Sequence, residues 1–244
     1  MTEPDADQTW LMSLFEAALP KMQLFLSSAA EYRTDLLKIG PDNPPEPRWN
    51  QDWFPRLDAL AAYVTVRRIQ PVRIVEVGAG HSTRFLARAI RDGILGTRLT
   101  SIDPQPRATL SGFDVISKPL QKIPLSLFGS LRAGDILFVD SSHVLEPGSD
   151  VERLFEHILP SLPSGILVHF HDIFLPDDYP ADWAPRRYNE QSAVAGLLET
   201  DVWQIEFSSA HAARQLGGAI AESVAGELPL IADARESSLW LRKR

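Results

Sequence analysis

The fold of this chain is decided by the stretch EVGAGHST, residues 76–83. The apolar run Arg73–Val77 that leads into it is typical of a buried strand, and residues 82–91 after it have the spacing of a helix that begins near Ser82 or Thr83. Two glycines lie between them. Glycine lets the backbone approach a ligand closely, because no Cβ occupies that space. The stretch therefore predicts a ligand-binding turn between a strand and a helix.

An acidic residue, Asp103, ends the next predicted strand, residues 98–102. It follows the glycine turn by about 20 residues, the spacing at which a carboxylate accepts hydrogen bonds from ribose hydroxyls in nucleotide-binding α/β domains. A dinucleotide fingerprint would have glycine where Thr83 stands. Glu76, two residues before the first glycine, is also unlike that fingerprint. It suits a ligand with a cationic amino acid part.

Short apolar runs alternate with helical stretches over the rest of the chain. Continuous apolar strands separated by helices indicate a mostly parallel sheet covered on both faces. We therefore predict a doubly wound, seven-stranded, Rossmann-like α/β fold. The further predicted strands are residues 113–116, 135–139, 165–170, 202–207 and 238–241, the further helices are 124–128, 150–159 and 191–199, and the Ala/Gly-rich stretch 217–226 is predicted to be a mobile or loosely packed connection.

Residues 1–70 are predicted to form an N-terminal helical cap and linker, and residues 71–244 the main domain. The cap would contain a helix over 10–26 that Pro20 should end or kink. A Pro-rich linker over 40–47 and a second helix over 52–69 would follow.

Composition excludes several classes of protein. The 244 residues carry a net charge of −8, which opposes non-specific binding to nucleic acid or to an anionic membrane. The absence of cysteine excludes disulfides, thiolate metal sites and cysteine nucleophiles. No apolar stretch approaches the roughly 20 residues of a membrane helix, and the first residues lack the apolar core of a signal peptide. We expect a cytoplasmic protein, with a homodimer as one option for its assembly.

Polar side chains follow two of the later strands, where strand ends should meet at the edge of the glycine turn. Asp140 and His143 follow one strand, and His171 and Asp172 follow the next. Two interpretations stay open. His171 or His143 could be a general base that deprotonates an acceptor hydroxyl, or Asp140, His171 and Asp172 could hold a divalent ion. His169 is expected to hydrogen-bond inside the fold.

Together with the glycine turn, the blocks FVDSSH (138–143) and VHFHDIF (168–174) make the chain resemble class I S-adenosylmethionine-dependent methyltransferases, and among these the methyltransferase-24-like branch. The resemblance extends from about residue 72 to the C-terminus. It implies S-adenosylmethionine as cofactor and methyl transfer to a small molecule, more readily at oxygen than nitrogen. The expected cofactor-binding residues are Glu76, Gly78, Ala79, Gly80, Ser82, Asp103, Pro104 and Asp140, with residues 118–121 near the adenine, and the expected catalytic residues are His171, His143 and Asp140.

Two other functions remain open at this point: a nicotinamide-dependent oxidoreductase, and a non-catalytic ligand-binding or scaffold protein on the same fold. Thr83 argues against the first, and the histidine–aspartate edge against the second. The polar, aromatic stretch 175–183 follows a strand at that edge. It is a candidate lid or acceptor wall, in which Tyr179, Trp183 and Tyr188 either contact a ring or simply pack.

Overall fold

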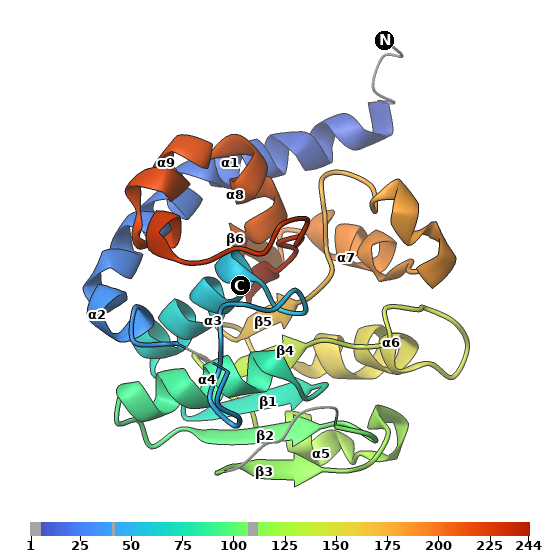
Figure 1. Ribbon diagram of the computed structural model, residues 1–244. Helices are drawn as coiled ribbons and strands as arrows, with labels where there is room; N and C mark the ends of the chain where they lie inside the picture. The colour runs from blue at the N-terminus through green and yellow to red at the C-terminus, as the bar shows by residue number, and fades with distance from the viewer. Residues whose placement is uncertain (1–5, 41, 107–111) are drawn as a thin grey trace.

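Seven strands form one sheet in the order β3-β2-β1-β4-β5-β7-β6 in the computed structural model, which describes residues 6–40, 42–106 and 112–244 (Figure 1). Only β7 runs antiparallel to its neighbours, so the predicted doubly wound, mostly parallel fold is confirmed. The strands are β1 (Arg73–Val77), β2 (Arg98–Ile102), β3 (Asp114–Ile116), β4 (Ile136–Val139), β5 (Leu167–Phe170), β6 (Trp203–Ser208) and β7 (Leu239–Lys243).

Helices cover both faces of the sheet. Figure 1 shows α3 (Arg56–Ile69) and α4 (His81–Asp92) in front, and α5 (Leu125–Phe128) and α6 (Asp150–Arg153) behind. The helix predicted over 150–159 is divided, because α6 continues as a π-helical turn and then a 3-10 turn. After β5 comes α7 (Glu190–Leu198), and after β6 come α8 (Ser209–Gln215) and α9 (Gly217–Glu222).

The N-terminal helix α1 (Ala6–Ser28) runs through Pro20, so of the two predicted effects of this proline, an end or a kink, the end is wrong. Pro20 is exposed, whereas Phe15 and Met22 on either side of it are fully buried. Both halves of the helix are therefore held by one core, and α1 packs against β6. The second predicted helix begins later than expected, at Arg56, after Pro55 in extended conformation.

The stretch 217–226 is not a loose connection, contrary to the prediction. It contains α9 and the start of a 3-10 turn, Val224–Glu227, in which Val224 and Ala225 are buried. At Gly226 a Cβ would collide with the backbone of Ala221, which shows how tightly this segment packs. Gly226 therefore allows close approach between the 3-10 turn and α9.

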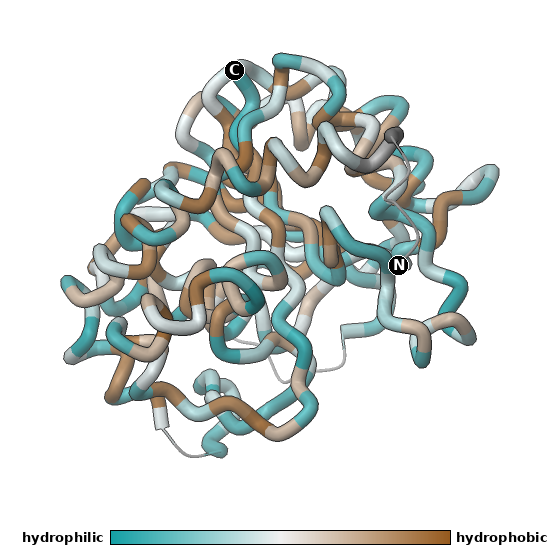
Figure 2. Tube along the Cα trace, turned by 90° about the horizontal axis from the view of Figure 1, so that it is seen from above, coloured by the Kyte–Doolittle hydropathy of each residue, from teal (hydrophilic) through white to brown (hydrophobic). Residues whose placement is uncertain are grey.

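One hydrophobic core joins the sheet with the N-terminal helices. Seen from above in Figure 2, hydrophilic stretches gather at many of the outer turns, and apolar ones run through the middle. In the described part of the chain, no helix combines the length and apolar character needed to cross a membrane.

Candidate active site

The glycine turn brings the ends of β1 and β4 into contact. Gly78 has a φ of +101°, which L-residues rarely adopt, and a Cβ there would lie 2.6 Å from the carbonyl oxygen of Asp140. Its N–H donates to the carbonyl of Ile102 at the end of β2 (2.8 Å). At Gly80, in contrast, a Cβ would meet nothing within 4 Å. The turn therefore needs glycine at 78 for its own packing, and at 80 it leaves open space.

Thr83 has a structural function at the start of α4. Its hydroxyl accepts a hydrogen bond from the N–H of Gly80 (2.9 Å), which caps the helix, and the side chain is fully buried. A third glycine at this position could not make this bond. The difference from a dinucleotide fingerprint thus has a physical role.

Glu76 lies beneath the turn with no exposed surface. Its two carboxylate oxygens accept hydrogen bonds from the hydroxyls of Ser82 (2.7 Å) and Ser101 (2.6 Å). Burial raises the pKa of Glu76 to about 7, against the opposing effect of the two serine hydroxyls. The carboxylate therefore joins the glycine turn, α4 and β2 at one point.

Asp103 ends β2 beside the turn and is half-buried. Its Oδ1 accepts a hydrogen bond from the N–H of Gln105 (2.7 Å), which fixes the carboxylate at the strand end. Pro104 is exposed and Ala79 is 8% exposed. In the stretch expected near the adenine, Gln121 donates to the carbonyl of Gly148 (3.0 Å).

The later strand ends bring the predicted histidines and aspartates together. Asp140 Oδ1 lies 3.3 Å from His143 Nε2 and 3.6 Å from His171 Nδ1. Asp172 reaches the same two rings, with Oδ2 at 3.6 Å from His143 Nε2 and Oδ1 at 3.4 Å from His171 Nδ1. We call these four residues the His–Asp cluster. Its members are buried except for Asp140, whose side chain is 37% exposed.

The charges in the cluster support one another. Burial alone would favour neutral side chains, but Asp140 and Glu190 hold the pKa of His143 well above its usual range, and Asp172 and Asp140 do the same for His171. Partial burial would likewise raise the pKa of Asp140, yet the two imidazoles hold it well below its usual range. At neutral pH the ionised Asp140 carboxylate therefore lies between two protonated histidines.

Two further carboxylates lie against the histidines of the His–Asp cluster, and the sequence did not predict either contact. Glu190, which the helix dipole alone would explain, is fully buried and lies 2.8 Å from His143 Nδ1, where it also accepts from the hydroxyl of Ser141. Asp58 of α3 is fully buried, 3.4 Å from His171 Nε2. Its Oδ1 accepts from the N–H of Ser238 (2.8 Å).

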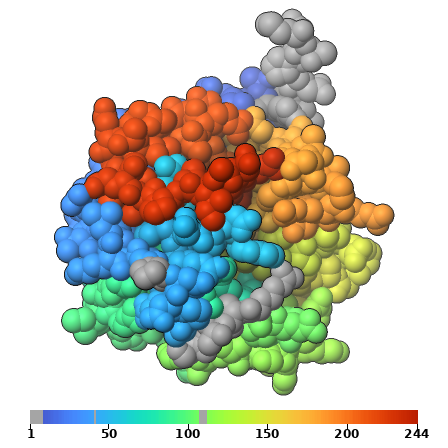
Figure 3. All heavy atoms as spheres, viewed as in Figure 1, coloured from blue at the N-terminus to red at the C-terminus, as the bar shows by residue number. Residues whose placement is uncertain are grey.

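No local signal in the sequence would have identified Asp58, which sits in the predicted cap. For Glu190 the only signal is its position directly after the aromatic loop that follows β5. Figure 3 shows that the segment before β7, in red, crosses the face between the N-terminal part of the chain and the part around α7. At the end of this segment the N–H groups of Ser237 and Ser238 donate to Asp58, which ties α3 to the cluster.

His169 is structural, as expected. It is fully buried, its ring stacks on Phe138 at 3.6 Å, and its Nε2 lies 2.8 Å from the hydroxyl of Ser238. Burial and the charge of His171 lower its pKa well below the usual range, so the ring is neutral.

The three residues expected to hold a divalent ion, Asp140, His171 and Asp172, do come together. Their nitrogen and oxygen atoms face one another at ion-pair distances of 3.4 and 3.6 Å. Asp172 Oδ1 also accepts from the hydroxyl of Ser237 (3.1 Å). Within the described ranges, no group of three or more histidines and acids has the arrangement of a metal site. The positions of Asp140, His171 and Asp172 therefore do not fit the predicted site for a divalent ion.

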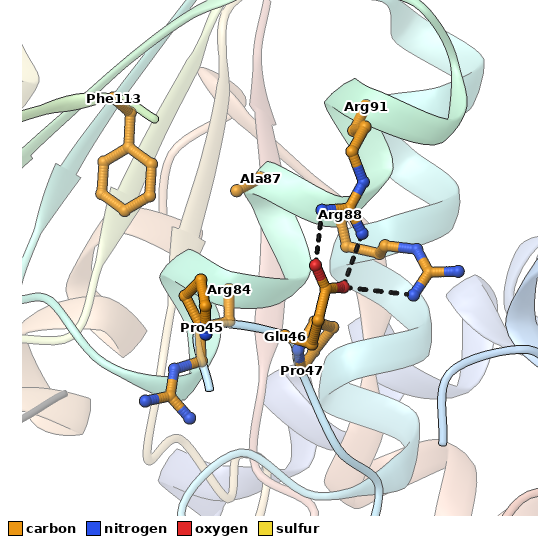
Figure 4. Close-up of a pocket in the computed structure, with 8 residues that line it drawn as sticks. All are labelled: Pro45, Glu46, Pro47, Arg84, Ala87, Arg88, Arg91 and Phe113. Carbon is orange, nitrogen blue, oxygen red and sulfur yellow. Dashed lines mark hydrogen bonds and ion pairs between the residues drawn. The ribbon is translucent and has the colours of Figure 1, made fainter. Parts of the chain in front are cut away.

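Two cavities elsewhere do not match the predicted site. A small one of about 50 Å³ lies between residues 45–47 and α4, where Glu46 bridges Arg88 and Arg91 (Figure 4). A larger one of about 390 Å³ is lined by β3 and the amino ends of β1 and β2, with Leu127 and Ser130 beside them. Since cofactors bind at the carboxyl ends in this fold, we assign the site from the strand ends.

Residues 75–173 match a family described as "Methyltransferase domain", the methyltransferase-24 type. The match contains the glycine turn, Asp103 and the whole His–Asp cluster. The chain carries a methyltransferase domain. Over these residues the match bears out the expected resemblance to S-adenosylmethionine-dependent methyltransferases, and it does not support the nicotinamide-dependent alternative.

Solved structures of methyltransferases share the fold at low identity. An O-methyltransferase from Bacillus cereus in complex with SAH is 14% identical, with 91% of this chain and 100% of that chain covered and a TM-score of 0.50. A putative O-methyltransferase from Klebsiella pneumoniae is 16% identical (91% and 98%, TM-score 0.50), as is the plantazolicin methyltransferase BpumL in complex with SAH (94% and 99%, TM-score 0.50). No curated protein sequence matches this chain.

Proposed function

We propose that this methyltransferase transfers the methyl group of S-adenosylmethionine to a hydroxyl oxygen of a small molecule. The observation that carries the proposal is the partly exposed Asp140 carboxylate, held between two imidazoles at the same strand edge as the glycine turn. Of the solved neighbours, one is described as an O-methyltransferase and another as a putative one, which supports oxygen as the acceptor atom.

For the cofactor we propose the glycine turn and the end of β2. The open space at Gly80 lets a ligand approach the backbone, and Asp103 offers a carboxylate to ribose hydroxyls. Glu76, under the turn, holds the turn in shape for the cofactor through its hydrogen bonds to Ser82 and Ser101. Bound here, the cofactor supplies a methyl carbon on a positively charged sulfur.

For the chemical step we propose that Asp140 accepts the proton of the acceptor hydroxyl. The hydroxyl oxygen bonds to the methyl carbon, the carbon–sulfur bond breaks, and its electron pair stays on the sulfur. The oxygen becomes strongly acidic as the new bond forms, so a weak base is sufficient. Asp140 is the most exposed member of the cluster, whereas the ring nitrogens of His143 and His171 face carboxylates on both sides.

The buried residues then act on Asp140 as positioning residues. Glu190 fixes the ring of His143 through Nδ1, which leaves Nε2 toward Asp140 and Asp172. Asp58 faces His171 from the opposite side. Preorganised charges of this kind orient the carboxylate before the substrate arrives.

Calorimetric titration with S-adenosylhomocysteine and with NAD, followed by turnover assays on hydroxylated acceptors, tests the proposal. We expect S-adenosylhomocysteine to bind and NAD not to bind. Asp140→Asn should reduce turnover at least about 100-fold while cofactor affinity changes only a few-fold. Binding of NAD alone, or full turnover in Asp140→Asn, would contradict the proposal.

Treatment with EDTA should leave turnover unchanged, and a loss that Mg²⁺ restores would reinstate the metal hypothesis.

A further inference from the structure

An aromatic wall extends away from the His–Asp cluster along the loop between β5 and α7. The ring of Tyr188 lies 4.6 Å from the ring of His143, and the ring of Trp183 lies 5.9 Å from that of Tyr188. Phe174 packs edge-on against Trp183 at 5.1 Å. The loop predicted as a candidate acceptor wall thus forms a continuous series of rings that begins at the cluster.

Arg186 lies on this wall. Its guanidinium carbon is 3.7 Å from the centre of the Trp183 ring and 5.6 Å from that of Tyr188, so the indole holds the planar group in place. The nearest carboxylate oxygen, Asp172 Oδ2, is 4.0 Å from Nη1, too far for a hydrogen bond. Across the described residues the Arg186 side chain forms no hydrogen bond, and it is 46% exposed.

Arg235 provides a comparison within the same molecule. Its guanidinium carbon also lies over Trp183, at 5.8 Å, and its side chain is 38% exposed. Unlike Arg186, it donates a hydrogen bond to the Asp182 carboxylate at 2.9 Å. One arginine on this ring is therefore already paired with a carboxylate, and the other is held in position with its donors unused.

We propose that Arg186 binds a carboxylate of the acceptor, and that the substrates are aromatic hydroxy acids. The inference rests on the proposed function, because it assumes that the hydroxyl lies at Asp140. A guanidinium fork matches a carboxylate with two parallel hydrogen bonds, and the wall offers rings against which a flat substrate can pack.

A chain of contacts links the two anchors and sets an upper bound on the distance between them. From Arg186 to Asp140 the contacts pass through Asp172 and His143, with separations of 4.0, 3.6 and 3.3 Å. A hydroxybenzoate or hydroxyphenylacetate has its carboxylate and hydroxyl at opposite ends of such a span. Methyl transfer to its hydroxyl follows the balanced step given above.

The test is calorimetric titration of the wild type, Arg186→Gln and the matched control Arg235→Gln, each with and without S-adenosylhomocysteine. The probes are 3,4-dihydroxybenzoate, 4-hydroxyphenylacetate and their neutral methyl esters. The wild type should bind the acids at least tenfold more tightly than the esters. Arg186→Gln should lose this preference, Arg235→Gln should keep it, and both variants should bind the esters like the wild type.

Equal affinity of Arg186→Gln and wild type for the acids would overturn the assignment, and so would a wild type that binds neither acid or prefers the esters. Loss of the preference in Arg235→Gln as well as in Arg186→Gln would overturn it too, because the effect would then be one of general charge. If the acids bind through Arg186 while S-adenosylhomocysteine does not bind, the proposed function fails and the carboxylate site stands.

Discussion

Different interactions hold the two ends of the candidate site, the glycine turn and the His–Asp cluster. At the glycine turn, backbone conformation and serine hydroxyls determine the structure. Gly78 has a positive φ, and the buried acid Glu76 accepts hydrogen bonds from two serine hydroxyls. At the ends of β4 and β5, paired charges hold the side chains in place, with four carboxylates around two imidazoles. The difference suggests that the turn recognises a donor by shape, while the cluster organises the acceptor's chemistry by charge.

The largest expected effect comes from breaking the charge cluster at Glu190. Because this carboxylate is fully buried against His143, Glu190→Gln should cost about 3–5 kcal/mol of unfolding free energy at neutral pH. Urea unfolding measures this cost. Glu199→Gln, at the exposed end of the same helix, is the matched control and should change stability by less than about 0.5 kcal/mol. Equal stability of the two variants would show that the contact between Glu190 and His143 does not stabilise the fold.

The pH dependence of stability should separate the two ends. Glu76 has a folded pKa of about 7 against an ordinary value of 4.5, so its neutral form is favoured. Its contribution is full below the ordinary pKa and is lost as pH rises through 7, a change of about 3 kcal/mol. Glu76→Gln should therefore flatten the stability curve between pH 5 and 7.

At the cluster the window is higher. The folded pKa values of His143 and His171 are raised above the ordinary 6.5, so their contribution is complete below that pH and falls as pH rises through the raised values. His143→Gln should flatten the alkaline side of the curve and leave the change between pH 5 and 6 in place. Identical curves of stability against pH for His143→Gln and Glu76→Gln would contradict the prediction that the two ends of the site titrate in different pH ranges.

Backbone conformation gives the next largest effect. Gly78→Ala adds a Cβ that would lie 2.6 Å from the Asp140 carbonyl oxygen at a φ of +101°, and should cost about 2 kcal/mol. Gly80→Ala meets nothing within 4 Å and should cost less than about 1 kcal/mol. Thermal unfolding of the two variants measures the difference. A Gly80→Ala variant as unstable as Gly78→Ala would mean that the turn is built differently.

The smallest effect is expected away from both ends. Glu46 bridges Arg88 and Arg91 on the outer side of α4, with 30% of its side chain exposed. Glu46→Gln should change stability by less than about 1 kcal/mol and leave cofactor binding unchanged, because exposed ion pairs contribute little. A large loss of cofactor affinity in this variant would extend the functional site to the small cavity beside α4.

The sequence could predict what depends on local pattern. The strands, the glycine turn and the meeting of Asp140, His143, His171 and Asp172 all follow from runs of apolar residues and from the geometry of parallel sheets. The continuation of α1 through Pro20 could not be predicted, because it depends on the shared core that holds Phe15 and Met22.

The same limit applies to the partners of the histidines. Glu190 and Asp58 each stand in the first turn of a helix, where an acid is already explained by the helix dipole. Only the tertiary arrangement turns them toward His143 and His171. Arg186 and Arg235 are equally alike in the sequence, and they differ only because Asp182 pairs with one of them.

The most direct test of this division is S-adenosylhomocysteine titration of the wild type, Gly78→Ala and Glu190→Gln under conditions where all three are folded. The account predicts that the wild type binds, that Gly78→Ala loses at least tenfold in affinity, and that Glu190→Gln stays within about threefold of the wild type, a difference of less than about 0.7 kcal/mol. A wild type that does not bind, or equal losses in the two variants, would contradict the assignment of donor binding to the glycine turn.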